Sequence, residues 1–144
     1  MGLTSEIRDA VETHLAGTPG LPSSTQWSVQ NTAFQPTLGT TWVRLTLAPG
    51  FRDLLTVPAE GGWVQTSGLV FVDLFFPLDR GADTADDLSD AVVTRFPPGQ
   101  QFTLTSGRTL RVTRSLARGG FREKEWYHVP VEIGWEIETV NALI

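Results

Sequence analysis

Strict alternation of apolar and other side chains, from Tyr127 to Glu138, constrains this chain more than any other feature of its sequence. Successive side chains of a β-strand point to opposite faces, so the run predicts one long strand with a buried and an exposed face. The predicted buried face consists of Tyr127, Val129, Val131, Ile133, Trp135 and Ile137. The predicted outward face consists of His128, Pro130, Glu132, Gly134, Glu136 and Glu138. Because proline has no N–H to donate, Pro130 predicts a sheet edge or a bulge, and an exposed edge invites pairing with another chain.

Composition predicts an ordinary globular protein. The 144 residues are 40% hydrophobic and 19% charged, which favours one domain over residues 1–144. A net charge of -5 argues against sequence-independent binding of nucleic acid, which depends on Lys and Arg neutralising phosphates. The chain contains no cysteine, so disulfides, thiolate metal sites and thiol nucleophiles are excluded. We expect no signal peptide, and no membrane span, because no apolar run approaches the roughly 20 residues that a span needs.

The remaining pattern predicts two amphipathic helices and several further strands. One helix is predicted over residues 4–17 and the other over residues 84–96, from apolar residues at helical spacing. Further strands are predicted around 27–34, 42–47, 63–76, 102–104 and 110–113, the last two as a hairpin. The segment 69–76 is apolar on both of its faces, so we expect it to be a central strand.

No group of residues has the spacing of a catalytic, cofactor-binding or metal site. We expect His14 to be a partly buried helix residue and His128 to be a surface residue, neither of them catalytic. Neither a Gly-x-Ser-x-Gly elbow nor a phosphate-binding glycine loop occurs. The aspartates between residues 83 and 90 mostly lie where acidic groups stabilise the start of a helix. Asp73, in the middle of an apolar strand, is expected to pair with a neighbouring arginine.

Most of the positive charge lies in one late segment, and this asymmetry is the clearest functional indication. The cationic residues are Arg108, Arg111, Arg114, Arg118, Arg122 and Lys124. In an acidic protein with a glutamate-rich strand nearby, they favour charge complementarity between copies of the same subunit. Phe121 among them is a candidate apolar anchor, with a solvated loop as the alternative. The candidate interface residues here are Arg114, Arg118, Phe121, Arg122, Glu132, Glu136 and Glu138.

A second candidate interface lies in residues 48–62, which are more apolar than a solvated loop should be. Phe51, Leu54 and Leu55 either fold back onto the core of their own subunit or dock against another subunit.

Several motifs, taken in order, resemble one family. They are the amphipathic helix at the start, the Leu21-Pro22 turn, Asn31-x-x-Phe34-x-Pro36, an apolar strand, a second helix ending in Phe96-Pro97, and Arg118-Gly119 followed after six residues by Trp126-Tyr127-x-Val129-Pro130-Val131. Together these resemble the tail terminator, or tail completion, proteins of long-tailed bacteriophages and of gene transfer agents. The resemblance covers nearly the whole chain and is most specific in the last third.

The resemblance implies an α/β (α+β) subunit in which two helices pack on a mixed or antiparallel β-sheet. It implies a structural virion protein without catalysis or cofactor, assembled in the host cytoplasm and placed at the head-proximal end of the tail. Such subunits would form a ring, a hexamer by analogy, that caps the tail tube and ends its polymerisation. The implied partners are further copies of the chain, the tail tube protein and the head-tail connector or stopper protein. DNA would pass through the channel without specific binding, and no membrane is involved.

Other functions fit parts of the pattern. A neighbouring head-completion or tail tube protein shares the small size and ring assembly, and a species forming filaments alone would favour a tube protein. A small acidic ligand-binding domain or hydrolase would require residues 49–62 to cover a pocket. A pocket that joined Asp73 to Arg44 or Arg111 would favour it.

Overall fold

The computed structural model describes residues 2–30, 33–54 and 63–140 of the chain. The elements, in chain order, are α1 (Leu3–Ala16), a 3₁₀ turn (Ser24–Gln26), β1 (Trp27–Val29), β2 (Trp42–Leu54), β3 (Trp63–Pro77), α2 (Asp83–Arg95), β4 (Gln101–Thr103), β5 (Thr109–Ala117), β6 (Phe121–Glu123) and β7 (Trp126–Val140). Both helices begin and end within one residue of the ranges predicted from the sequence. Neither described helix is long and apolar enough to cross a membrane.

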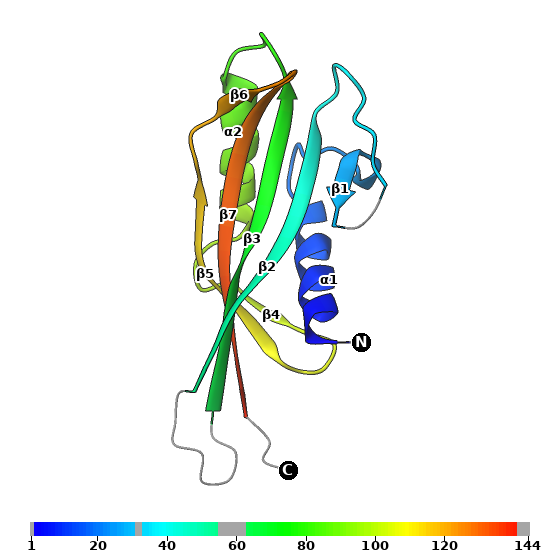
Figure 1. Cartoon of the computed structure of the whole chain (residues 1–144). Helices are drawn as coiled ribbons and strands as arrows, with labels where there is room; N and C mark the ends of the chain where they lie inside the picture. The colour runs from blue at the N-terminus through cyan, green and yellow to red at the C-terminus, as the bar shows by residue number, and fades with distance from the viewer. Residues whose placement is uncertain (1, 31–32, 55–62, 141–144) are drawn as a thin grey trace.

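One mixed sheet of seven strands forms the backbone of the fold. Its order is β1-β2-β3-β7-β5-β4, and the short β6 pairs with β7 as well. Strand β1 is parallel to β2 and the other pairs are antiparallel. Both helices lie on the same face of the twisted sheet, behind it in the view of Figure 1. The predicted α+β class, two helices on a mixed sheet, is therefore confirmed.

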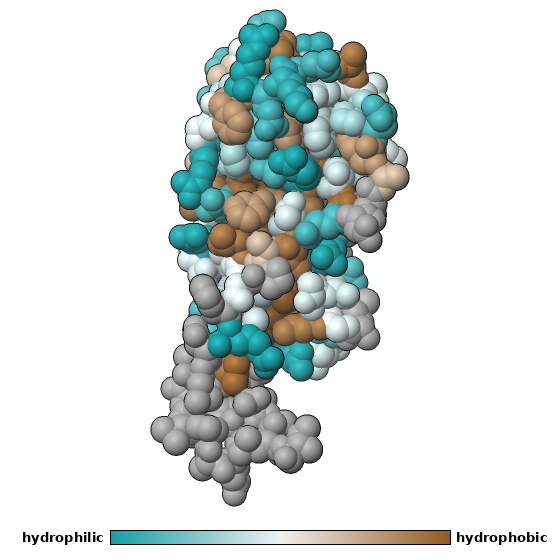
Figure 2. Space-filling view, in the orientation of Figure 1, coloured by the Kyte–Doolittle hydropathy of each residue, from teal (hydrophilic) through white to brown (hydrophobic). Residues whose placement is uncertain are grey.

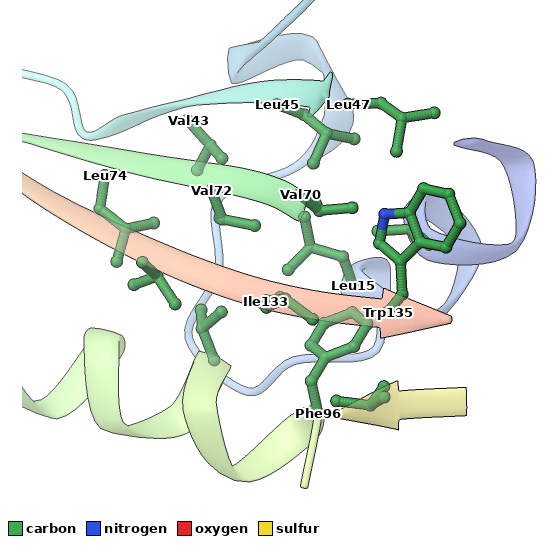
Figure 3. Packing of buried hydrophobic residues seen from close by; sticks show 14 of the residues in the cluster. Leu15, Val43, Leu45, Leu47, Val70, Val72, Leu74, Phe96, Ile133 and Trp135 are labelled. Carbon is green, nitrogen blue, oxygen red and sulfur yellow. The ribbon is translucent and has the colours of Figure 1, made fainter. Parts of the chain in front are cut away.

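The core lies between the inner face of the sheet and the two helices. Apolar side chains of β2, β3 and β7 meet Leu15 of α1 and Phe96 after α2 (Figure 3). The buried face of β7 is confirmed, because five of its alternate side chains are at most 3% exposed: Val129, Val131, Ile133, Trp135 and Ile137. Burying a large apolar side chain contributes roughly 1.5–3 kcal/mol. This row therefore anchors the helices to the sheet.

Pro130 does not mark a sheet edge, so that expectation was wrong. Strand β7 lies in the interior, between β3 on one side and β5 and β6 on the other. The N–H of Arg118 donates to the carbonyl oxygen of Pro130 at 2.8 Å. Since the N and C=O of one strand residue point to the same side, the missing donor of Pro130 faces the break between the end of β5 and the start of β6. Pro130 faces Arg118, in the interval between β5 and β6 where the strand pairing is interrupted, which makes proline acceptable in a central strand.

Three strands extend beyond the helices. The ends of β2, β3 and β7 that adjoin residues 55–62 project past the body of the molecule in Figure 1. A β-bulge between Pro49 and Arg52 of β2 marks the start of this extension. Bulges increase the local twist of a strand.

Candidate subunit interface

The outward face of β5 and β7 carries ion pairs that form within one subunit. Arg118 donates two hydrogen bonds to Glu132, from Nε to Oε1 at 2.8 Å and from Nη2 to Oε2 at 3.1 Å. Arg114 lies 3.8 Å from the same carboxylate, and Arg111 pairs with Glu136. The antiparallel register of β5 on β7 places these residues together, with Arg111 directly opposite Glu136. The cations of β5 are therefore largely matched by the acids of β7.

This pairing corrects one expectation from the sequence. The arginines and the glutamates were expected to form two separate patches of opposite charge, one on each side of a contact between copies. They instead lie on adjacent strands and neutralise each other in the same subunit. The hydrogen bonds from Arg118 lower the pKa of Glu132, and the same hydrogen bonds raise the pKa of Arg118. Glu132 and Glu136 are therefore not unpaired acidic groups on the outward face.

His128 points outward as predicted, but it is not a surface residue. Only 5% of it is exposed, because its ring stacks on Phe75 at 4.3 Å between centroids and is covered by Phe121 at 4.8 Å. Its Nε2 lies 2.8 Å from Oδ1 of Asp73. The second oxygen of Asp73 accepts a hydrogen bond from Arg44 Nε at 3.3 Å, which confirms the expected arginine partner. The network ties β2, β3 and β7 together on the outward face.

Aromatic residues cover part of the outward face, and sequence reasoning missed them as a cluster. Trp42 stacks on Phe75 with 4.0 Å between ring centroids, and Trp126 meets Trp42 edge-on at 5.9 Å. Phe34 packs against this cluster. The sequence contained one indication of this cluster, because Trp126 lies two residues before His128 and therefore points to the same outward face of β7. The outward face is thus apolar at one end and ionic along β5, and Figure 2 shows this side of the molecule with mixed apolar and polar patches.

Phe121 remains the most prominent exposed group of the cationic segment. It is 45% exposed, and Leu38, at 70%, is the other large hydrophobic residue that is exposed in the described part of the chain. Next to Phe121, Arg122 and Lys124 are exposed and form no ion pair with another described residue. Glu138 is exposed as well. The segment 121–124 therefore offers an exposed ring on the outward face of β6 and two cations without an ion-pair partner in the described part of the chain, Arg122 on the opposite face and Lys124 in the turn.

The second candidate interface can be placed only in part. Phe51 and Leu54 belong to β2 at the projecting end of the sheet, but their side chains are not among those described. Leu55 lies outside the described residues. The proposed role of these three residues stays a prediction.

The helix side of the molecule carries a groove between α2 and the connection that follows α1. One hollow of about 350 Å³ is lined by Pro19, Gly20, Pro22, Thr40, Thr41, Phe76, Thr84, Asp87 and Leu88. A second, of about 500 Å³, shares Pro19 and Asp87 with the first and is lined in addition by His14, Asp90, Ala91, Thr94, Arg95, Pro97 and Gln100. The shared residues place the two hollows next to each other. The floor is mostly apolar and the α2 rim is acidic.

The described residues contain no group of three or more histidine, aspartate or glutamate side chains that could hold a metal ion. Both carboxylate oxygens of Asp73 are occupied by partners in the same subunit.

Comparison with known proteins agrees with this geometry. The model of the phage tail terminator protein family matches residues 6–135. The chain belongs to the phage tail terminator family. It is therefore a structural component of the viral tail. A solved structure whose function is not described is 24% identical, covers 94% of this chain and 96% of its own, and has a TM-score of 0.70, which shows the shared fold. No curated protein matches the chain.

Because the family is structural, the sheet face and the helix face of the subunit are more relevant to its role than a reaction centre. On the helix side, His14 lies in the groove, its Nε2 2.7 Å from the carbonyl oxygen of Arg95 and its ring edge-on to Phe96 and Phe102. Burial lowers the pKa of His14, and the positive charge of Arg95 lowers it further. The hydrogen bond to the backbone of Arg95 acts in the opposite direction but is outweighed. The neutral imidazole is thus the form that fits this contact between the helices.

The lowered pKa of His14 makes folding stability depend on pH. Because the unfolded chain binds a proton at this residue more readily than the folded chain, stability falls as the pH drops through and below the unfolded value of about 6.5. We expect His14→Gln, which keeps a donor for the carbonyl oxygen of Arg95, to lose less stability than the native chain between about pH 7.5 and pH 5.5. Urea melts of both proteins at the two pH values measure this, and parallel losses would contradict it.

Proposed function

We propose that this chain closes the tail tube as a ring, most simply a hexamer, that ends tube polymerisation and joins the tail to the head connector. Family membership over residues 6–135 is the observation that carries the proposal. The ring binds the last tube subunits on one side and the connector or stopper protein on the other. The chain acts without catalysis, at the head-proximal end of the tail, after assembly in the host cytoplasm.

Two properties of the chain support a ring around passing DNA. A closed ring needs two different surfaces on each subunit that fit each other, and the sheet face and the helix face of this subunit differ in both charge and shape. The net charge of -5 disfavours a tight grip on phosphates, so DNA can move through the channel without specific binding. A subunit that stacked on itself without limit would form filaments instead of rings.

The proposal is tested by mass and by particle assembly. Native mass spectrometry of the purified chain, alone and with tail tubes, should reveal one discrete ring species, and a sixfold mass is expected. Particles made without the protein should have tails of uncontrolled length and separated heads, and supplying the chain should restore joined particles of uniform length. Filaments of the chain alone, or normal tails in its absence, would reject the proposal.

A further inference from the structure

An acidic surface would complement the exposed cations Arg122 and Lys124, and the outward sheet face does not provide one. Glu132 and Glu136 are already paired with arginines of their own subunit. Helix α2 carries four exposed aspartates: Asp83, Asp86, Asp87 and Asp90. Within the described residues, none of the four forms an ion pair, and residues 81–94 contain no cation.

Two of these aspartates are not accounted for by the helix itself. Asp83 and Asp86 belong to the first turn of α2, where a carboxylate stabilises the positive end of the helix dipole. Asp87 and Asp90 lie beyond that turn and line the groove instead. They place negative charge on a groove whose lining includes the apolar Pro19 and Ala91. The cation Arg95 also lines this groove, but it donates to the carbonyl oxygen of His14. A partner with both apolar and cationic groups therefore fits the α2 side of the groove.

The chain itself contains a segment with that chemistry. We propose that the groove on the helix face of one copy receives the segment 118–124 of the next copy, with Phe121 in the 350 Å³ hollow and Arg122 and Lys124 beside Asp87 and Asp90. This inference rests on the ring of the proposed function and names its subunit contact.

Size and charge both support this occupant. A dry cavity of about 150 Å³ is large enough to bind benzene, so the hollow has room for a phenyl ring. Phe121 is already half exposed, and Arg122 and Lys124 have no ion-pair partner in the described part of their own subunit. Lys124 has φ = 52°, in the left-handed region, within the tight turn that joins β6 to β7. The turn keeps Lys124 close to Phe121, and Arg122 projects from the opposite face of the same three-residue strand, which a groove that encloses the edge of β6 would also contact.

The placement of the two surfaces favours a head-to-tail arrangement. Phe121 pairs with His128 on the outward side of the sheet, whereas the groove belongs to the helix side, and Figure 1 shows the helices behind the sheet. A contact between two different surfaces of one subunit is heterologous, and repeated rotation closes it into a ring. A twofold dimer would instead bring one surface against its own copy.

Cross-linking provides the direct test, because the natural chain has no cysteine. The double variant Thr84→Cys with Gly119→Cys places one thiol at the groove and one on the segment, keeps Phe121, and adds a side chain at Gly119 where nothing lies within 4 Å. Each single variant is the control. With a short bismaleimide we expect a covalent ladder up to the full ring from the double variant, and none from either single variant. Rings that form normally without this ladder would overturn the groove contact and leave the proposed function standing. No ring in solution or on tail tubes would overturn both.

A charge exchange checks the same contact without new thiols. We expect Asp87→Lys with Asp90→Lys to lower the ring fraction about tenfold, the scale of close charge pairs across an interface. Arg122→Asp with Lys124→Asp should lower it similarly, and the four changes together should restore most of it. The matched control, Asp83→Lys with Asp86→Lys, changes the same charge on the same helix outside the groove and should leave ring formation near the native level. Loss without restoration in the fourfold variant would refute the pairing.

Discussion

Replacing Trp135 with alanine should destabilise the subunit by about 3–5 kcal/mol, the range found when a buried large aromatic side chain is deleted. Trp135 is 2% exposed and belongs to the apolar row of β7. Its indole lies over Gly68 of β3, where any added side chain would meet the ring. The neighbouring strand thus has no side chain that can fill the cavity left by the substitution. Urea melts of the purified variant measure the change in the free energy of unfolding.

The control is a position on the other face of the same strand. Glu138→Ala removes an exposed carboxylate three residues further along β7 and should change stability by no more than about 0.5 kcal/mol. Similar losses in both variants would mean that the two faces of β7 are assigned incorrectly. Both substitutions lie in β7, one on its buried face and the other on its exposed face.

The second large effect concerns assembly. The double variant Arg118→Glu with Arg122→Glu reverses both charges. It should abolish most joining of phage heads to tails while the subunit stays folded. Both residues are exposed, and exposed charges contribute little to stability. Joined particles counted by electron microscopy, with circular dichroism melts of the isolated subunit, separate the two effects. A control double reversal at Arg80 and Arg108 makes the same change in net charge outside residues 118–124.

The ion pair between Arg118 and Glu132 permits a finer test. Adding Glu132→Arg to Arg118→Glu restores an opposite-charge pair within the subunit with its polarity exchanged. With Arg122→Glu kept in the same variant, we expect the exchange to repair the internal pair but to restore little joining of heads to tails, because Arg122, which forms no ion pair within the described part of its own subunit, is still reversed. Full restoration would show that only the internal pair matters. Normal joining of heads to tails in the Arg118→Glu, Arg122→Glu variant would mean that this segment is not the interface. Phe51, Leu54 and Leu55 would then be the better candidates.

The sequence predicted those parts of the fold that depend on local periodicity. Alternation identified the buried row of β7, and helical spacing located both helices, because each pattern reflects a single face of a single element. The central position of β3 followed from its apolar character on both faces. Even the Asp73–Arg44 pair was expected, since a carboxylate inside an apolar strand needs a cation.

What the sequence could not predict depends on which strands become neighbours. Pro130 was read as an edge signal because its tolerance depends on a break between β5 and β6 that no local pattern reveals. The pairing of Arg118 with Glu132 follows from the register of β5 on β7, across residues 14 apart in the chain. The acidic groove likewise arises only when α2 packs near the connection after α1, so sequence reasoning treated its aspartates as helix-start residues.

The position of β7 within the sheet has a consequence for how the chain folds. It is the last strand in order, yet it supplies partners to β3, β5 and β6. Until it is synthesised, one edge of β3, the most apolar strand, stays open, and contacts between distant residues slow folding and leave such intermediates prone to aggregation. The sheet therefore cannot close between β3 and β5 until β7 has been synthesised.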